Sequence, residues 1–198
     1  MSHVNSFVRV PGIVLRHKLR ALPRLDLLET DRVRLRVWPT DIDFNFHMNN
    51  ARYLSYMDYG RVHLTAAVGL LDEAMQHRWV PLVGSVVVTY RRSIGLWKPF
   101  TLGTRVLCWD EKWFYMEQTF HASNGLAAIA WVKALFRTSG HNVPTERIVE
   151  RIAPGRLSPP MPANIAHWND ISYDKLHSLA ALDASAHVRK GRSKDGNG

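Results

Sequence analysis

The sequence predicts an α+β domain in which a five-stranded antiparallel sheet is wrapped around one long central helix. One stretch of about 20 residues places apolar side chains at helical spacing. Five other stretches are alternating in polarity or rich in β-branched residues, and four of them follow the helix with short connections. Long strands joined by tight turns pair antiparallel, and such a sheet buries its apolar face against a helix.

The first strand is expected at Asp31–Trp38, where apolar residues alternate with arginines. Strict alternation indicates a strand with one exposed face, and Pro39 ends it. The helix is expected to begin at Asn49 or Asn50, because asparagine is a preferred N-cap, and to end near Gly69. Its apolar stripe consists of Tyr53, Met57, Leu64, Val68 and Leu71.

Four strands are expected after the helix. The turn Ser123-Asn124-Gly125 between the last two is a strong hairpin signal. The last strand is nearly all apolar, as expected for a strand buried on both faces. A five-stranded sheet retains free edges, so we expect self-association as a homodimer or tetramer. The four strands are Leu82–Arg92, Phe100–Trp109, Trp113–Ala122 and Leu126–Thr138.

The 198 residues divide into four expected parts. Residues 1–30 form a basic N-terminal strap, in which five cations precede Asp26, the first acid. Residues 31–140 form the domain. Residues 141–182 form an extension with a proline-rich linker and short helices. Residues 183–198 are small, polar and basic, and they are expected to be a disordered tail.

The formal net charge of +9 is concentrated near both ends of the chain, so we expect no nucleic-acid partner. The basic strap is compatible with weak contact to a membrane surface. The single cysteine, Cys108, excludes an internal disulfide and a multi-cysteine metal site. No run of about 18 apolar residues predicts a membrane span, so a cytoplasmic location is expected, with organelle targeting by the basic N-terminus left open. No cofactor and no metal are expected, because ligand spacings and phosphate-binding loops are absent from the sequence.

An acid, an amide and an imidazole occupy alternating positions directly before the expected helix, at Asp43, Asn45 and His47. If this stretch is extended, the three side chains point the same way. The helix start adds free backbone N–H groups and the positive end of a dipole. An acid–base group beside donors that can stabilise an oxyanion is a reaction-centre layout.

This layout and its motifs resemble the hotdog-fold acyl thioesterases of the 4-hydroxybenzoyl-CoA thioesterase type, over about half of the chain. Asp41-x-Asp43 is similar to the D-x-D of bacterial acyl-CoA thioesterases, in which the second acid is catalytic. Residues Tyr53–Arg61 are similar to the helix signature of those enzymes. The stretch Asp43–Tyr53 also resembles the motif of the plant acyl-ACP thioesterases.

The resemblance implies a single hotdog domain that hydrolyses an acyl-CoA or acyl-ACP thioester, with coenzyme A as part of the substrate and no separate cofactor. Asp43 is then a general base for water or a nucleophile on the carbonyl. Asn45 positions the water or the carbonyl, and His47 orients these groups or acts as acid–base itself. Backbone N–H groups near Asn50 and Ala51 polarise the thioester oxygen. Further substrate-binding candidates are Tyr53, Asp58, Arg91 and Arg92.

The candidates also have structural interpretations. His47 could only pack or hydrogen-bond at the helix entry, and Arg91 and Arg92 could belong to a solvated face. Asp43 and Asn45 could satisfy N–H groups of a turn, and Asp41 could hold that turn. Asp58 could simply pair with Arg61 on the same helix. The alternative function is a non-catalytic acyl or lipid binder with a basic membrane-surface strap, and a hotdog dehydratase or hydratase is a further one. The acyl group and its carrier are left open by the sequence.

Overall fold

The computed structural model of the chain describes residues 24–174. They belong to two compact units, one ending at Pro159 and the other starting at Pro160. Most of the expected strap, 1–30, lies outside the described residues, and so does the whole expected tail, 183–198.

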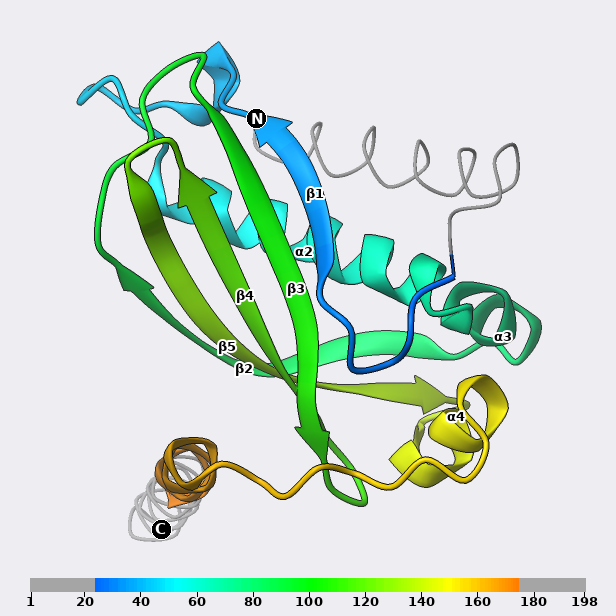
Figure 1. The fold of residues 1–198 in the computed structure, drawn as a ribbon. Helices are drawn as coiled ribbons and strands as arrows, with labels where there is room; N and C mark the ends of the chain where they lie inside the picture. Colours follow the sequence, from blue (N-terminus) through cyan, green and yellow to red (C-terminus); the bar gives the residue numbers. More distant parts are fainter. Residues whose placement is uncertain (1–23, 175–198) are drawn as a thin grey trace, which may run out of the picture. The chain divides into compact units, whose positions relative to one another are not determined.

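Six strands of the first unit form one antiparallel sheet (Figure 1). They are β1 (Asp31–Arg36), β2 (Val80–Tyr90), β3 (Pro99–Trp109), β4 (Phe114–Ala122), β5 (Gly125–Thr138) and β6 (His141–Val143). The order is β1-β3-β4-β5-β2, and β6 pairs with the end of β5. The meander β3-β4-β5 confirms the expectation from the short turns. The sixth strand was not expected; it forms because the chain reverses at Ser139 and Gly140, both at positive φ.

Two helices follow β1, where the sequence predicted one. Helix α2 spans Asn50–Ala67 and α3 spans Leu70–Gln76. They are separated at Gly69, whose φ of 79° is a left-handed conformation that glycine adopts without strain. The expected helix end near Gly69 is confirmed, whereas Leu71 belongs to the next helix. The sheet lies across α2, so the predicted hotdog architecture is confirmed (Figure 1).

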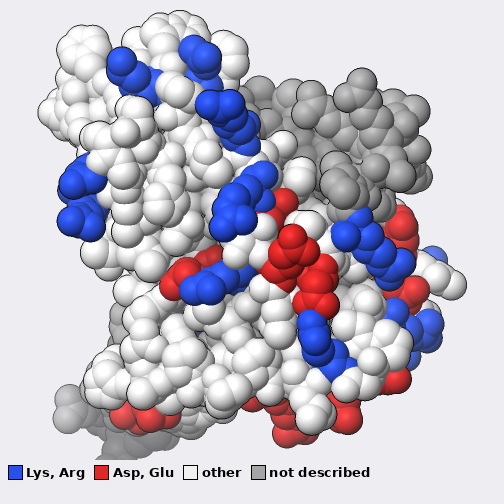
Figure 2. All heavy atoms as spheres, viewed as in Figure 1, with Lys and Arg blue, Asp and Glu red and all other residues white. Residues whose placement is uncertain are grey.

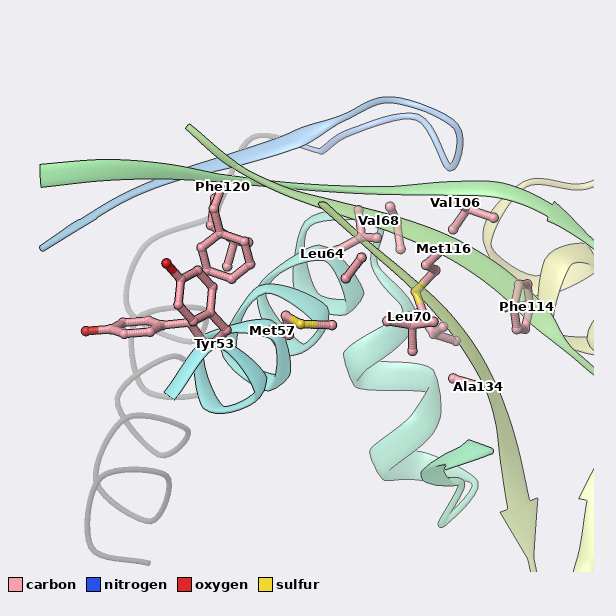
Figure 3. Packing of buried hydrophobic residues seen from close by; sticks show 14 of the residues in the cluster. Tyr53, Met57, Leu64, Val68, Leu70, Val106, Phe114, Met116, Phe120 and Ala134 are labelled. Carbon is pink, nitrogen blue, oxygen red and sulfur yellow. The ribbon is translucent and has the colours of Figure 1, made fainter. Parts of the chain in front are cut away.

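The hydrophobic core lies between α2 and the sheet. Tyr53, Met57 and Leu64 of α2 are buried against the inward-facing residues of β3 and β4 (Figure 3). Gly60 lies on the same helix. A Cβ atom there would come within 2.6 Å of Thr104 Oγ1, so the missing side chain lets the helix approach the sheet closely.

Three further helical segments complete the described chain. A 3₁₀ turn, η1, spans Pro39–Asp41 before α2, and α4 spans Thr145–Ile152 after β6. Residues 163–174 of the second unit are helical. None of the helices within residues 24–174 combines the length and apolar character needed to span a bilayer.

Candidate active site

Asp43 lies in a tight turn. Its carbonyl oxygen accepts a hydrogen bond from Phe46 N–H at 3.1 Å, and its own N–H donates to the His47 carbonyl at 3.3 Å. The chain can reverse so sharply because Phe46 has a φ of 58°. The extended backbone on which the sequence argument placed the side chains of Asp43, Asn45 and His47 together is therefore wrong.

The carboxylate of Asp43 is half-buried and held from two sides. Its Oδ1 accepts the backbone N–H of Asn45 at 2.9 Å, and its Oδ2 lies 3.5 Å from the amide nitrogen of Asn49. A carboxylate can accept about four hydrogen bonds. The turn thus fixes the orientation of Asp43 and leaves acceptor capacity for a water molecule or a substrate. The structural interpretation as a turn residue and the chemical one are both compatible with this geometry.

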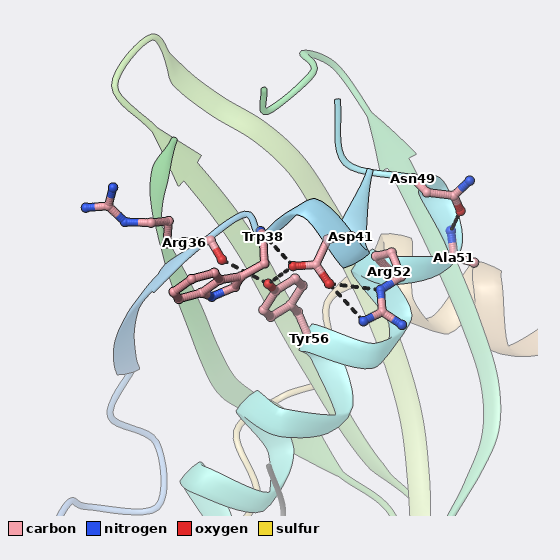
Figure 4. A network of polar contacts seen from close by, with 7 residues as sticks. All are labelled: Arg36, Trp38, Asp41, Asn49, Ala51, Arg52 and Tyr56. Atoms are coloured by element: carbon pink, nitrogen blue, oxygen red, sulfur yellow. Dashed lines mark hydrogen bonds and ion pairs between the residues drawn. The ribbon is translucent and has the colours of Figure 1, made fainter. Parts of the chain in front are cut away.

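Asn49 connects the Asp43 carboxylate to the start of α2. Its backbone is extended and its Oδ1 accepts the Ala51 N–H at 2.9 Å, which is the geometry of an N-cap (Figure 4). The Nδ2 group of the same side chain faces Asp43. The sequence identified Asn49 only as a helix-start candidate. Its second contact was missed, and the run Asn49-Asn50 was the only signal for it.

Of the two expected backbone donors, one is already used. The Ala51 N–H is taken by the cap, and the Arg52 N–H donates to the Asn49 carbonyl at 2.8 Å. The Asn50 N–H makes no hydrogen bond with any residue between 24 and 174. It lies at the positive end of the α2 dipole, so it is the donor suited to a developing negative charge.

Asp41 forms a buried polar network beside the turn (Figure 4). Its Oδ1 accepts two hydrogen bonds from the Arg52 guanidinium, at 3.0 and 2.8 Å. Its Oδ2 accepts the Trp38 N–H at 2.9 Å and lies 2.5 Å from the Tyr56 hydroxyl, which is also 3.0 Å from the Arg36 carbonyl. These contacts tie β1, η1 and α2 together, so the structural interpretation of Asp41 fits.

Tyr53, a substrate-binding candidate, lies in the core with 2% of its surface exposed. Its ring packs against Tyr90 and Phe120, with centroid distances of 5.0 and 4.8 Å. Burial, with a smaller contribution from Tyr90, raises the pKa of Tyr53 to about 12. The Tyr53 ring therefore packs in the core beneath the start of α2 and is not exposed at the surface.

The remaining candidates surround the turn. Asn45 is exposed and His47 is half-buried, and the imidazole makes no hydrogen bond with a described residue. Arg91 and Arg92 follow the end of β2, and both N–H groups donate to the Ala127 carbonyl. The side chains of both arginines are exposed, and that of Arg92 also donates to the turn between β4 and β5.

A largely apolar cavity of about 310 Å³ lies between the C-terminal half of α2, α3 and the sheet. Asp58 and Arg61 form the expected ion pair at this cavity. Arg61 also donates to Gln118 Oε1 at 2.9 Å, and burial lowers its pKa although Asp58 opposes the shift. Gln118 is itself fully buried. Figure 3 labels several of the lining side chains, among them Leu64, Val68, Leu70, Val106, Phe114, Met116 and Ala134.

The cavity and the Asp43 turn lie apart within one chain. Asp58 and Arg61 are eight and eleven residues beyond Asn50, the first residue of α2. At 1.5 Å per residue, they lie about 12 and 16 Å along the helix from its start. A site that used both features would need them to be brought together by something other than this helix.

Two further kinds of site, a metal centre and a cysteine nucleophile, find little support among residues 24–174. No group of three His, Cys, Asp or Glu side chains between residues 24 and 174 is arranged to hold a metal ion. Burial, with a smaller effect of Asp110, raises the pKa of the Cys108 thiol to about 11. A buried, protonated thiol is a poor nucleophile, so Cys108 is a structural residue.

Comparison with known protein families and proteins gives matches that include the Asp43 turn. A family model described as the thioesterase-like superfamily matches residues 37–169, which include the Asp43 turn, the cavity-lining strands and α4. Protein THEM6 of Xenopus laevis is 34% identical over 184 residues, covering 89% of this chain and 86% of that protein. A probable thioesterase of Saccharomyces cerevisiae is 28% identical over 89 residues, covering 44% of this chain and 38% of that protein.

Solved structures show the same fold. A thioesterase from Thermus thermophilus, crystallised with coenzyme A and Zn, matches with a TM-score of 0.55 and 28% identity, covering 64% of this chain and 98% of that one. The probable thioesterase YbaW from Escherichia coli matches with a TM-score of 0.54 and 18% identity, covering 62% and 96%. At 18% identity, the second likeness concerns the fold alone.

Proposed function

Because the chain belongs to the thioesterase-like superfamily, we propose that it hydrolyses an acyl thioester to a free acid and a thiol, with Asp43 as the reacting carboxylate. The observation that carries this proposal is the placement of Asp43. Its carboxylate is oriented by the Asn45 N–H and the Asn49 amide. It lies directly before the start of α2, where the Asn50 N–H donates to no residue of the described range. This arrangement pairs a base with an oxyanion donor.

The reaction then follows from these groups. Asp43 accepts a proton from a water molecule whose oxygen attacks the thioester carbonyl carbon. The Asn50 N–H and the positive end of α2 stabilise the negative oxygen that forms. As the tetrahedral intermediate collapses, the C–S bond breaks and the thiolate takes the proton from Asp43. The exposed Asn45 side chain positions the water, and His47 lies beside the turn as a second acid–base group. Direct attack by Asp43, through an anhydride that water opens, is the alternative route.

The apolar cavity is suited to the acyl group. Its lining is hydrophobic apart from the Asp58–Arg61 pair and Thr65, and its volume lies at the lower end of the range of ligand pockets. Leu82 and Val83 of β2 line it from one side. Since the cavity is about 12–16 Å along α2 from the Asp43 turn, the complete site is proposed to form between two copies of the chain.

The second copy is proposed to pair along β2. Within the described sheet, β2 pairs only with β5, so its other edge is unpaired. Exposed apolar side chains on an unpaired edge favour association with another strand. An antiparallel pairing about a two-fold axis would run two α2 helices in opposite directions and place each Asp43 turn toward the other cavity. The exposed apolar residues of β2 include Val80, Leu82, Val83, Val87 and Tyr90.

The proposed substrate is an acyl-CoA, and an acyl-ACP is the second candidate. The Tyr90 hydroxyl donates to the Asn50 carbonyl at 3.2 Å, so the end of β2 lies at the start of α2. Arg91 and Arg92 follow directly with exposed guanidinium groups. Cations at this position are suited to the phosphates of coenzyme A, because arginine binds phosphate oxygens in a bidentate manner.

The test is thiol release from a panel of short, long and aromatic acyl-CoAs, comparing the native chain with Asp43→Asn. Asparagine keeps an oxygen that accepts the Asn45 N–H, but it cannot act as a base. We expect kcat to fall by about 10²–10⁴ while the circular dichroism spectrum is unchanged. Glu111→Gln, which neutralises an exposed acid in the turn between β3 and β4, is the matched control and should keep native turnover.

Other outcomes separate the alternatives. Unchanged turnover in Asp43→Asn would make Asp43 a turn residue only. Absence of turnover on every CoA ester would direct the assay to acyl-ACP. Absence on both carriers, together with saturable binding of an acyl thioester, would support the non-catalytic acyl binder.

A further inference from the structure

Four large aromatic side chains are exposed at the end of the sheet that carries the Asp43 turn. Phe44 is 89% exposed, Phe46 73%, Trp38 48% and Trp97 47%. They lie on two segments, residues 36–48 and 91–98, which we call the aromatic rim. Backbone hydrogen bonds join the two segments, from Trp97 N–H to the Val37 carbonyl at 3.0 Å and from Met48 N–H to the Ile94 carbonyl at 2.8 Å. The rings of Trp38 and Trp97 meet edge to face, 5.4 Å apart.

Two of these aromatic residues occupy backbone positions that favour glycine. Phe46 has a φ of 58° and Trp97 a φ of 62°. Bulky residues rarely adopt this region, because the Cβ atom clashes with the backbone. Neither side chain compensates by packing into the core, since Phe46 is 73% and Trp97 47% exposed. These two strained positions therefore present aromatic rings to solvent instead of burying them.

Positive charge surrounds the rim. Arg36, Arg91, Arg92 and Lys98 are exposed, and Arg36 Nη1 donates to the Trp97 carbonyl at 3.2 Å. The two acids of the rim segments are Asp41, which is buried against Arg52, and the half-buried Asp43. Figure 2 shows Lys and Arg without Asp or Glu in the upper part of the face, while the acidic side chains gather from its middle downward.

We propose that the aromatic rim docks on the surface of an anionic lipid bilayer. Phe44 and Phe46 would insert at the boundary between headgroups and acyl chains, and Trp38 and Trp97 would lie at the headgroup level, where tryptophan is enriched. Arg36 and Lys98 would contact the anionic headgroups. Exposed aromatic tips surrounded by cations combine the two attractions that hold peripheral proteins on membranes.

In the dimer proposed above, the second copy pairs along β2 and brings its cavity toward the Asp43 turn. The competing occupant of the aromatic rim is therefore the rim of another copy. In a two-fold contact the same patch meets itself, so Arg36, Arg91, Arg92 and Lys98 would face like charges. Such a juxtaposition is unfavourable, whereas an anionic bilayer complements the patch. Charge therefore favours the lipid surface.

The docking has a consequence for the reaction, which rests on the proposed function. Asp43 lies within the rim, so docking would place the edge of the site proposed between the two copies beside the bilayer. Thioesters whose acyl chains partition into the membrane would then reach the site from the lipid side. The docking itself does not depend on thioester hydrolysis.

The test is flotation of the full chain with vesicles of phosphatidylcholine alone and of phosphatidylcholine with phosphatidylserine. We expect binding to the anionic vesicles that weakens with added salt, because exposed charges are screened. The double variant Phe44→Ser/Phe46→Ser should bind about tenfold or more weakly, since two apolar side chains no longer leave water. The variant Arg36→Gln/Lys98→Gln should bind several-fold more weakly per cation removed.

The chain offers matched controls far from the rim. Leu157 is 85% exposed and lines a hollow with Trp109 and Glu111, at the opposite end of β3. Leu157→Ser should float like the native chain, and so should Lys112→Gln in the turn between β3 and β4. Circular dichroism and light scattering on every variant establish that fold and subunit number are retained.

Three results would overturn the proposal. One is absence of vesicle binding by the native chain, or equal binding to neutral and anionic vesicles. Another is native-like flotation of Phe44→Ser/Phe46→Ser, which would assign binding to another part of the chain. The third is a loss of subunit number in that variant with vesicle binding intact, which would make the rim a contact between copies. Flotation needs no turnover, so failure of the thioesterase assay leaves this test unaffected.

Discussion

Asp41 and Asp43 are two residues apart and of the same type, yet their surroundings differ completely. Asp41 is fully buried, and both of its carboxylate oxygens are engaged by Arg52, Trp38 and Tyr56. Asp43 is half-buried and has one short hydrogen bond, from the Asn45 N–H, and one long contact. The first carboxylate joins elements of the fold, while the second retains capacity for a reactant.

This difference shows why the acid with the stronger contacts is the weaker candidate for chemistry. A buried charge needs every lone pair satisfied, because an unpaired one is costly to keep out of water. A carboxylate that meets this requirement has no acceptor left for a water or a substrate. Asp43 is oriented by the turn without being saturated, which a general base requires.

Removal of the Asp41 carboxylate should have the largest effect on stability. Asp41→Ala leaves the Arg52 guanidinium and the Trp38 N–H, both partly buried, without the buried carboxylate that accepts from them. We expect the free energy of unfolding to fall by about 3–5 kcal/mol, measured by urea titration. Asp43→Asn is the internal reference and should change the same quantity by less than about 1 kcal/mol, since its turn acceptor is kept. Similar losses in both variants would refute the division into a structural and a chemical acid.

Asn49 allows the orientation of Asp43 to be separated from helix capping. Asn49→Ser keeps an oxygen that can accept the Ala51 N–H but lacks the amide donor facing Asp43. We expect nearly native stability and a kcat lower by about tenfold, which corresponds to loss of one hydrogen bond to a charged group. Asn49→Ala should show the same loss of kcat and an additional loss of about 1 kcal/mol in stability.

The decisive readout for Asn49 is how kcat and KM divide. A positioning residue lowers kcat with KM nearly unchanged, because the substrate contacts remain. A purely structural residue would leave kcat per folded molecule at its native value in Asn49→Ser. That result would limit the role of Asn49 to the helix cap.

The fold was predictable because apolar patterns are local. Alternation and β-branched runs identified β1 to β5 to within a few residues, and Asn49 and Gly69 marked the ends of α2. The strand β6 has only three residues, too few for a periodic pattern, and it depends on the reversal at Ser139 and Gly140. Gly69 marked the end of α2, but helix α3 was not expected, because the apolar spacing continues to Leu71 and was assigned to a single helix.

The site was predictable in its residues and not in its geometry. The motif selected Asp43, but the turn depends on a left-handed Phe46, which local preference argues against. Tyr53 belongs to the same motif, and only tertiary packing shows that its ring faces Phe120 in the core. The contact between Arg61 and Gln118 joins residues 57 positions apart, so no local pattern could reveal it.

The smallest predicted effect concerns the strain in the Asp43 turn. Phe46→Gly replaces a bulky residue at a φ of 58° with the residue that adopts this conformation freely. Relief of about 1–2 kcal/mol of backbone strain is partly offset by the greater flexibility of glycine in the unfolded chain. We expect a net gain of about 0.5–1 kcal/mol in the free energy of unfolding, measured by thermal and urea unfolding. Phe44 does not have a positive φ, so Phe44→Gly is the matched control and should lose about 0.5–1 kcal/mol. Opposite signs in the two variants would show that the turn which presents Asp43 stores backbone strain at Phe46, whereas a loss in both would place the stability of the turn in the phenylalanine side chains.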